Sequence, residues 1–290
     1  MIKFVPHHLI DRDKYDRCIS QAKNSRIYAF SWYLDCVTEK WDVLMSDSYE
    51  AVMPLPIRKK YGLNYIYTPP WTQQLGIFSQ ELITEEEIFQ FINKIPAKFI
   101  LVDYMLNASN PLKRLPHKEK NNFILSLNKS FEALLAGFNK NRKRISKQNF
   151  DNFQIEKKGC KGIFLSLFKG QDKRFSITKD AVLKLEKLLA MDNDQVHIWN
   201  VYKEDVCVGG LLWLKDQKRI TYLVPVIPDE VKKEHLNTFL VNALIEEYQQ
   251  QDLLLDFEGS MIPGVARFYE SFGATSEIYY FYKKRFLTHV

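Results

Sequence analysis

The pattern of apolar and polar positions predicts a chain that mixes strands and helices. In the second half, three segments read as strands joined by short Lys-Glu-Asp and Lys-Asp-Gln turns. These segments, residues 196–202, 206–214 and 219–224, should form an antiparallel meander. From about residue 230 to 250, apolar residues return every three or four positions, which predicts a long helix.

A nearly continuous apolar run at residues 253–257 predicts a strand buried on both faces. The run breaks into a Gly-Ser turn. A helix is expected from Pro263 to Gly273, because proline favours the first turn of a helix and glycine its end. A last strand is expected at residues 278–282. The helix should bury three side chains on one side: Val265, Phe268 and Phe272.

The first half alternates helices and strands in the same mixed α/β manner. A polar stretch with two prolines, residues 107–121, is expected to be a long exposed connection. A second series of elements begins with a helix at Ser130, so the pattern predicts two domains, residues 1–128 and 129–290. The elements expected before this boundary are helices at 11–22, 31–39 and 85–95, and strands at 1–5, 41–45, 49–57, 63–67, 98–103 and 122–127.

Length and composition fit two ordinary globular domains. A chain of 290 residues is long for one hydrophobic core, because domains usually hold about 100–150 residues. Hydrophobic residues make up 46% and charged residues 26%, which argues against disorder on a large scale. No apolar run approaches the roughly 18–20 residues that cross a bilayer, and the N-terminus lacks the apolar centre of a secretory signal. We therefore expect a cytoplasmic protein.

Charge and cysteine content narrow the chemistry only slightly. The net charge of +6 attracts anions such as coenzyme phosphates, tRNA or anionic lipid, but does not choose among them. The cysteines contain no C-x-x-C pair and have no nearby histidine cluster, which predicts reduced thiols and no metal site. They are Cys18, Cys36, Cys160 and Cys207.

The helix that begins at Pro263 resembles a motif of a known enzyme superfamily. Residues 266–274 read Ala-Arg-Phe-Tyr-Glu-Ser-Phe-Gly-Ala, similar to the Ala-x-x-Leu-Tyr-x-x-x-Gly-Phe of the last crossover helix in GNAT N-acyltransferases. The acidic strand end before it, Asp-Phe-Glu-Gly-Ser at 256–260, resembles the Fem branch, which makes peptidoglycan cross-bridges and keeps two GNAT-like domains in one chain. The resemblance implies an α/β (α+β) fold of tandem GNAT-like domains, each a mixed, mostly antiparallel sheet flanked by helices. It also implies a degenerate first domain and an active site in the second.

Around the end of the buried strand, the resemblance implies the chemistry of amine acylation. In GNAT enzymes an amine attacks a thioester carbonyl, a carboxylate or water takes the amine proton, and a tyrosine can protonate the leaving thiolate. Glu258, with Asp256, is the candidate for orienting or deprotonating the amine, Tyr269 for the acid, and Ser260 for binding substrate. The alternative is structural, with helix caps at Asp256 or Ser260, a solvated Glu258 and a packing role for Tyr269.

A basic run at residues 140–147 is expected to end the helix that starts at Ser130. It resembles the Asn/Arg-Arg-x-Ile-Arg-Lys-Ala stretch that opens the second domain of Fem-like proteins. Arg142, Arg144 and Lys147 are candidates for holding phosphates of a coenzyme, a tRNA end or a lipid-linked precursor, because guanidinium forks match phosphate oxygens. The alternative is a solvated helix face whose charges favour the helix dipole.

An aromatic and proline-rich segment, residues 61–76, forms the third candidate constellation. Fem-like proteins carry a similar loop, ending in glycine, that faces the substrate cleft. The resemblance implies that Tyr67, Trp71 and Gln74 supply stacking surface and amide hydrogen bonds for a polar acceptor. A packed Ω-loop is the alternative interpretation of the same residues.

One departure from the GNAT pattern leaves the donor open. GNAT enzymes bind the pyrophosphate of coenzyme A with a glycine-containing turn before the long helix, where backbone N–H groups meet the phosphates. The matching residues, 226–237, contain no glycine and include Asp229 and Glu230. Fem-type enzymes also lack this turn and use aminoacyl-tRNA, but they often carry a coiled-coil insertion for tRNA, and no heptad run occurs here. The donor is therefore acyl-CoA, acetyl-CoA included, or aminoacyl-tRNA.

Together these features predict an N-acyltransferase that moves an acyl or aminoacyl group to an amine without a metal cofactor. The expected acceptor is a small molecule or a lipid-linked component of the cell envelope, as in peptidoglycan synthesis, and tRNA is a possible partner. The alternative is a non-catalytic protein that binds an anion or a nucleotide on a GNAT scaffold and has lost donor binding.

Overall fold

The computed structural model describes residues 1–60, 62–171 and 177–285, so residue 61, in the turn predicted between two strands, lies outside them. The chain divides into two compact units. Unit 1 comprises residues 1–120, 183–188 and those from 278 onward, and unit 2 comprises residues 121–182 and 189–277. The boundary predicted between residues 128 and 129 falls inside unit 2.

Unit 1 is built on a mixed sheet. Its strands are β1 (Lys3–Val5), β2 (Lys40–Met45), β3 (Ala51–Lys60), β4 (Leu63–Tyr67), β5 (Phe78–Ser79), β6 (Phe99–Leu106) and the end of β13 (Thr275–Arg285). They follow the order β1-β2-β3-β4-β6-β13, and β5 pairs with β3. Among these described strands only β4 and β6 pair in parallel, so this part of the sheet is mostly antiparallel.

The helices of unit 1 are α1 (Arg12–Gln21), α2 (Ser31–Val37), α3 (Glu85–Asn93) and the middle of α7 (Lys179–Ala190). Short 3-10 turns occupy His7–Leu9, Ile27–Ala29 and Asp47–Tyr49. The start of α3 shows how the local sequence sets a boundary. Thr84 and Glu87 form a capping box, in which the side chain of each residue accepts a hydrogen bond from the backbone N–H of the other. The helix then buries its apolar stripe of Ile88, Phe91 and Ile92.

The segment after β6 differs from the exposed connection that its polarity predicts. Asn107 and Asn110 are fully buried. The Asn110 side-chain oxygen accepts the N–H of Ile77 at 2.7 Å, and the Asn107 amide donates to the carbonyl of Leu75 at 2.8 Å. The next strand, β7 (His117–Ser126), also starts five residues before the predicted position. Polarity misleads here because a buried amide is tolerated when its hydrogen bonds are satisfied.

The strands of unit 2 follow the order β7-β12-β11-β10-β9-β8. Besides β7, whose first residues belong to unit 1, its strands are β8 (Gln154–Glu156), β9 (Val196–Lys203), β10 (Val206–Lys215), β11 (Arg219–Val226) and β12 (Leu254–Asp256). The predicted antiparallel meander is confirmed in β9, β10 and β11. Between β11 and β12 the pairing is parallel, as a helical crossover between them requires.

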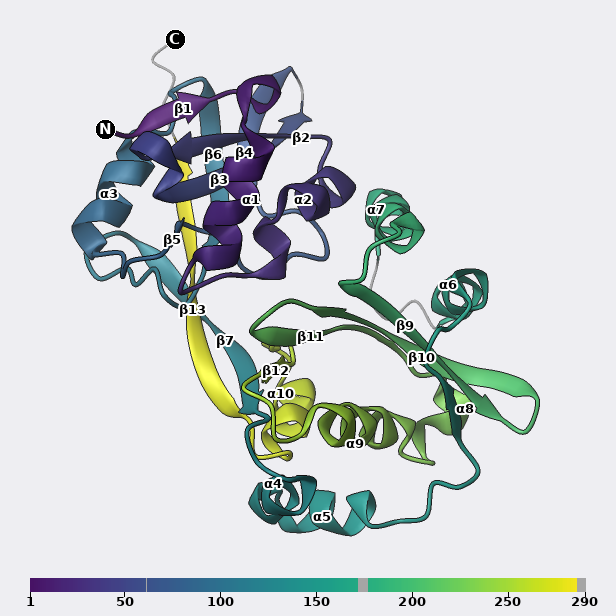
Figure 1. The fold of residues 1–290 in the computed structure, drawn as a ribbon. Helices are drawn as coiled ribbons and strands as arrows, with labels where there is room; N and C mark the ends of the chain where they lie inside the picture. The colour runs from purple at the N-terminus through teal and green to yellow at the C-terminus, as the bar shows by residue number, and fades with distance from the viewer. Residues whose placement is uncertain (61, 172–176, 286–290) are drawn as a thin grey trace. The chain divides into compact units, whose positions relative to one another are not determined.

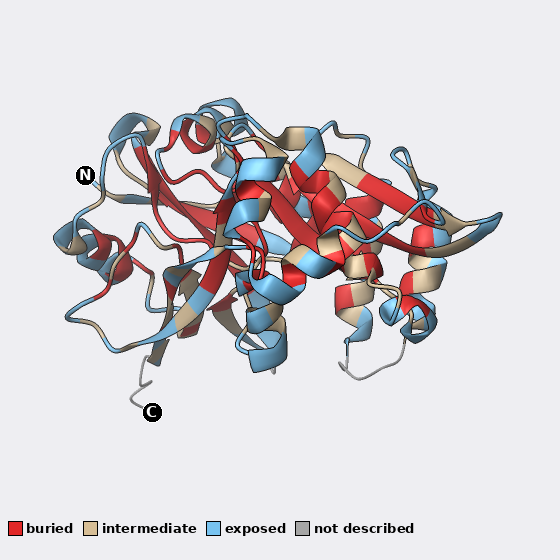
Figure 2. Cartoon of the chain, turned by 90° about the horizontal axis from the view of Figure 1, so that it is seen from below, coloured by how far each residue is buried: buried red, intermediate tan, exposed pale blue. Residues whose placement is uncertain are grey.

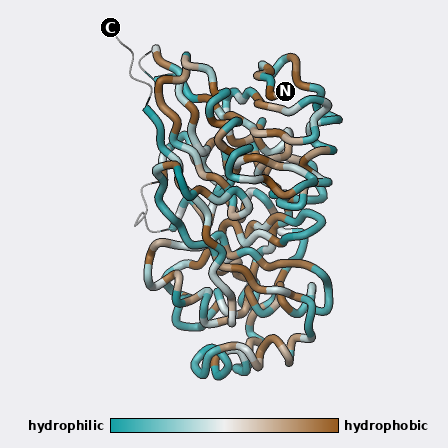
Figure 3. Tube along the Cα trace, turned by 90° about the vertical axis from the view of Figure 1, so that its left-hand side faces the viewer, coloured by the Kyte–Doolittle hydropathy of each residue, from teal (hydrophilic) through white to brown (hydrophobic). Residues whose placement is uncertain are grey.

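Helices cover both faces of the unit 2 sheet (Figure 1). They are α4 (Phe131–Gly137), α5 (Lys140–Ser146), α6 (Lys161–Gly170), α8 (Asp229–Lys232), α9 (Leu236–Tyr248), α10 (Pro263–Glu270) and the two ends of α7. One hydrophobic core lies between the strands and α4, α9 and α10, and α6 packs on the opposite face of β9 and β10. Buried residues concentrate in strands and on the inner sides of helices (Figure 2), and hydrophobic and hydrophilic stretches alternate along the trace (Figure 3).

Two predicted long helices are each broken in two. The helix expected from Ser130 stops at Phe138, where the backbone is extended, and Asn139 caps α5 by accepting the N–H of Arg142 at 2.8 Å. The helix expected from 230 to 250 is split into α8 and α9 by His235, whose φ of 60° is left-handed. Both breaks occur at residue types that favour caps and turns or tolerate positive φ.

Candidate active site

The sheet of unit 2 opens where β12 ends. β11 and β12 pair in parallel from Arg219 and Leu254 to Thr221 and Asp256. The next residue, Phe257, donates its N–H to the carbonyl of Phe123 on β7 at 2.9 Å, so the chain stays with β7 and leaves β11. Strand β11 continues to Val226, and within the described part of the chain no strand pairs with this edge beyond Thr221. Its backbone groups there have hydrogen-bonding capacity on a side where the described chain supplies no strand.

The turn after β12 has an unusual backbone. Glu258 has a φ of 58° and Gly259 a φ of 53°, both left-handed. Glycine adopts such angles freely, whereas glutamate does so at a cost. Gly259 also lies against β7, because a Cβ built on it would sit 2.1 Å from the carbonyl oxygen of Asn121. The predicted substrate-binding residue Ser260 follows, and its hydroxyl accepts the N–H of Ile262 at 3.0 Å, just before α10.

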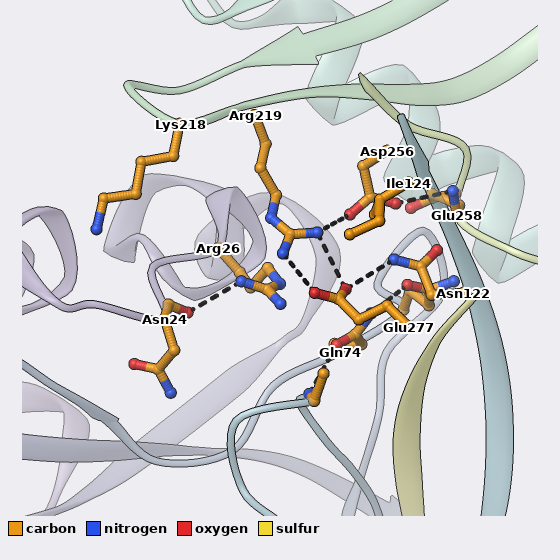
Figure 4. Close-up of polar contacts among 12 residues, drawn as sticks. Asn24, Arg26, Gln74, Asn122, Ile124, Lys218, Arg219, Asp256, Glu258 and Glu277 are labelled. Atoms are coloured by element: carbon orange, nitrogen blue, oxygen red, sulfur yellow. Dashed lines mark hydrogen bonds and ion pairs between the residues drawn. The ribbon is translucent and has the colours of Figure 1, made fainter. Parts of the chain in front are cut away.

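A buried cluster of charges supports this turn (Figure 4). Asp256 is 1% exposed, and its Oδ2 lies 2.7 Å from Nη1 of Arg219, while Oδ1 accepts the N–H of Glu258 at 2.9 Å. Arg219 also reaches Glu277 at 2.7 and 3.1 Å, and Asn122 donates to Glu277 at 3.1 Å. Both carboxylate oxygens of Asp256 are thus engaged, which suits a structural role better than proton transfer.

Tyr269 lies in the core beside the turn. Its ring stacks on Phe257 with centroids 4.8 Å apart, and only 9% of the residue is exposed. Burial, and then the negative charge of Glu258, raise the pKa of the Tyr269 hydroxyl well above its ordinary value. The hydroxyl is therefore protonated at neutral pH, and no described residue forms a hydrogen bond with it. Glu258 and Tyr269 are two of the predicted site residues, and Phe257, next to Glu258 in the chain, carries the stack on Tyr269.

Arg142 is a buried anchor rather than an exposed cation. It is 8% exposed, its Nε donates to the Ser271 hydroxyl at 2.9 Å, and its Nη1 donates to the Thr238 hydroxyl. The guanidinium lies 4.5 and 4.7 Å from the ring centres of Phe268 and Phe272. Burial lowers the pKa of Arg142 to about 10, and the guanidinium still carries its charge at neutral pH. Arg142 thereby joins α5 to the start of α9 and the end of α10.

The start of α9 gathers positive charge. Arg144 and Lys147 on and after α5 are exposed. Burial, and then the charges of Arg142 and Arg144, lower the pKa of His235 below its usual 6.5. Arg142 itself reaches the first turn of α9 through the Thr238 hydroxyl. The first turn of α9 contains no acidic residue, and the N–H groups of its first two residues, 236 and 237, have no acceptor in the described chain. Such a helix start can bind an anion.

The acid residues that precede α9 are partly neutralised. Asp229, in α8, forms an ion pair with Lys232 one turn later on the same helix. Strand β11 leads into this region, and the Tyr222 hydroxyl donates to the side chain of Asn237. The open edge of β11 therefore runs between the cationic start of α9 and the turn at Glu258.

The aromatic and proline-rich segment belongs to unit 1 and is well packed there. Gln74 is completely buried, and its side-chain oxygen accepts the N–H of Ala108 at 3.2 Å. The Trp71 carbonyl accepts the hydroxyl of Tyr33. Tyr67 is 8% exposed and accepts a hydrogen bond from Lys184 at 3.3 Å. These contacts fit a packed loop, so the acceptor-binding role of the three residues stays a prediction.

Sequence reasoning misses Arg219, Glu277 and Asn122. They come from three strands, and nothing in their local sequence separates them from ordinary strand residues. The one available signal is Arg219 at the first position of the third strand of the predicted meander, since a charged side chain that a strand buries needs a partner. Two further findings concern the described residues alone: no group of three or more His, Cys, Asp and Glu side chains is placed to hold a metal ion, and no helix is long and apolar enough to cross a bilayer.

Comparison with protein-family models gave no match, and comparison with curated protein sequences gave none either. Solved structures are similar in fold. A structure of FemX superposes with a TM-score of 0.66 at 11% identity, over 93% of this chain and 96% of that one. The tandem GNAT protein from the clavulanic acid biosynthesis pathway gives 0.56 at 9% identity over 100% of both chains. L-PGS from Bacillus licheniformis gives 0.57 at 12% identity, over 97% and 93%.

These likenesses show the fold of the chain. The chain has the fold of the tandem GNAT protein and of FemX, and the predicted α/β class with mixed, mostly antiparallel sheet is confirmed.

Replacing Gly259 by alanine should destabilise the protein by roughly 2–4 kcal/mol, the sum of a left-handed backbone and a clash with β7. Urea denaturation followed by circular dichroism measures this. Gly264→Ala is the matched control in α10, because a Cβ there meets nothing within 4 Å and alanine gains up to about 1 kcal/mol in a helix. Equal stability of the two variants would show that the turn is not tightly held.

Replacing Arg144 by glutamine should raise the pKa of His235 toward 6.5, because one of two nearby positive charges is removed. An NMR titration of the His235 ring protons measures the pKa. Lys140→Gln serves as control, since Lys140 is on the same helix but is not among the charges that shift His235. An unchanged pKa in Arg144→Gln would place Arg144 too far from α9 to share an anion with His235.

Proposed function

We propose that this protein is an N-acyltransferase that moves an acyl or aminoacyl group from a thioester or an aminoacyl-tRNA to an amine. The observation that carries this proposal is the parting of β11 and β12, with Glu258 and Tyr269 beside it. The tandem GNAT fold supports the reaction class, since the similar structures include a GNAT protein and FemX. The acceptor we propose is a small-molecule or lipid-linked amine of the cell envelope.

The donor is proposed to lie along the open edge of β11. Backbone groups from Tyr222 to Val226 would hydrogen-bond an extended arm, as a strand edge does with a peptide. One end of that arm would carry phosphate to the N-terminus of α9, where Arg144, Lys147 and His235 supply positive charge. The other end would bring the acyl carbon to the turn at Glu258.

The reaction assigns one proton transfer to each of two residues. The amine nitrogen attacks the acyl carbon, and Glu258 accepts the proton that this nitrogen loses. When the tetrahedral intermediate collapses, the bond to the leaving sulfur or ribose oxygen breaks, and Tyr269 donates its proton to that atom. The raised pKa of Tyr269 keeps the proton available. Afterwards Glu258 loses its proton to solvent and Tyr269 regains one from solvent. The products are an amide and a thiol or hydroxyl.

Asp256 takes a supporting part in this proposal. Both its oxygens are engaged, so it holds the turn, while Ser260 fixes the entry to α10 through the N–H of Ile262. Arg142 likewise supports the site from within, since it links the start of α9 to the helix that carries Tyr269. The non-catalytic alternative keeps the anion site and loses the transfer, and the lack of a glycine turn before α9 favours it.

Ligand binding tests the proposal first. A ligand that binds only the folded protein raises its free energy of unfolding, and with it the melting temperature. At a ligand concentration of one hundred times the dissociation constant, the gain in free energy is about 2.7 kcal/mol. Stabilisation by acetyl-CoA or a longer acyl-CoA would identify a thioester donor, and stabilisation by aminoacyl-tRNA beyond that by uncharged tRNA would identify an aminoacyl donor. Arg144→Gln should weaken either shift. Stabilisation by none of these would contradict donor binding and favour the non-catalytic protein.

Replacing Tyr269 by phenylalanine should lower turnover by about 100- to 10,000-fold, the usual contribution of a general acid. The melting temperature should stay close to that of the wild type, because the ring and its stacking on Phe257 are kept. Turnover is measured with the donor found in the thermal screen. Tyr248→Phe removes a hydroxyl from α9 as a control and should keep full turnover. Full turnover in Tyr269→Phe would rule out Tyr269 as the acid.

A further inference from the structure

Asp256 uses its two carboxylate oxygens for different partners. Oδ2 accepts from Nη1 of Arg219 at 2.7 Å, and Oδ1 accepts the backbone N–H of Glu258 at 2.9 Å. A carboxylate is planar, so holding one oxygen restricts where the other can point. Arg219 therefore helps to set the direction of Oδ1, and with it the conformation in which the chain leaves β12.

Arg219 is itself held from a second side. Two of its nitrogens contact Glu277 at 2.7 and 3.1 Å, and the amide of Asn122 donates to Glu277 at 3.1 Å. The side chains of Arg219 and Asp256 are 7% and 1% exposed, and that of Glu277 is 17% exposed. The guanidinium thus bridges two carboxylates in a fixed, forked geometry that a lysine cannot reproduce.

Stability alone does not explain this arrangement. Moving charges out of water is costly, and a buried ion pair often contributes no more stability than apolar residues of the same volume. The turn that it supports is also strained, since a non-glycine residue in the left-handed region costs about 1–2 kcal/mol and Glu258 has a φ of 58°. Costs of both kinds at one place are typical of a functional site.

We propose that Arg219 is a positioning residue, which acts through Asp256 to hold Glu258 in its left-handed turn, one residue from Phe257, on which the Tyr269 ring stacks. This inference rests on the proposed function, in which Glu258 and Tyr269 exchange protons with the reactants. Arg219 does not touch the reactants in this scheme. Its role is to keep the left-handed turn after β12 in one conformation.

The test is an NMR measurement that needs no substrate. The protein is labelled with tyrosine carrying ¹³C at Cζ, and the Tyr269 resonance is assigned from its loss in Tyr269→Phe. At neutral pH, Glu258→Gln should shift this resonance, because a charge next to the hydroxyl is removed. Arg219→Lys keeps its positive charge but cannot bridge two carboxylates, so it should shift the resonance in the same direction by at least half as much.

A matched control separates positioning from a general loss of an ion pair. Glu247→Gln breaks an ion pair with Lys157, whose atoms lie 3.2 Å apart elsewhere in unit 2, and should leave the Tyr269 resonance in place. If Arg219→Lys folds and its Tyr269 resonance stays at the wild-type position, the proposal is overturned. If Arg219→Lys does not fold, Glu277→Gln replaces it, since it weakens one of the two anchors. A smaller shift in the same direction is then expected, and no shift overturns the proposal equally.

The outcomes for positioning and for the proposed function are distinct. Shifts in the expected variants, with no donor binding in the thermal screen, would leave Arg219 as the residue that holds the turn and refute the transferase. No shift in Glu258→Gln would show that Glu258 does not act on Tyr269, which removes the premise of positioning. With a donor identified, Arg219→Lys should lower kcat with KM nearly unchanged and should add no further loss in a Glu258→Gln background.

Discussion

The parting of two parallel strands is the constraint on which the rest of unit 2 depends. β12 is only three residues long, and after Asp256 its chain is retained by β7 through the N–H of Phe257. Strand β11 consequently keeps one unpaired edge over its last five residues. An unpaired edge in the middle of a sheet has to be satisfied by water or by a ligand, because backbone groups carry an obligatory hydrogen-bonding capacity. The core of aromatic rings beneath it keeps the opening from collapsing.

Two buried arginines hold the elements around this opening in contrasting ways. Arg219 is matched by two carboxylates and joins strands. Arg142 is matched by two hydroxyls and two aromatic faces and joins helices. The first arrangement favours a defined direction of hydrogen bonding, and the second supports packing while leaving net positive charge near the start of α9. Arg219 joins β11 to β12 and β13, and Arg142 joins α5 to α9 and the end of α10.

Much of this fold could be predicted because its signals are local. The polar turns and apolar runs that mark β9, β10 and β11, and Pro263 and Gly273 at the ends of α10, act within a few residues. What escaped prediction depends on partners distant in sequence. Asn110 looks like a loop residue until its acceptor role for Ile77 is known. The breaks at Asn139 and His235 also fall inside segments that were each expected to form one helix.

The candidate site was predictable to a similar, partial extent. Tyr269 and Glu258 could be proposed from a motif, because residues that lie close to each of them in the sequence also lie close to it in space. Arg219 and Glu277 are 58 residues apart in the sequence. No sequence pattern indicates that the first residue of one strand will pair with a residue near the start of another. The buried position of Arg142 was also hidden, since a run of basic residues reads as solvated when the tertiary partners of one member are unknown.

The left-handed backbone of Glu258 has an evolutionary consequence. Asparagine and glycine tolerate positive φ better than glutamate does, so either would relieve strain at this position while deleting the carboxylate. A lineage released from selection for the proposed transfer would therefore gain stability by the same substitution that removes the proposed base. Inactive homologues that keep the fold should therefore arise more readily from such a site than from one whose catalytic carboxylate lies in an unstrained strand. Residue 258 is where they would first differ in sequence.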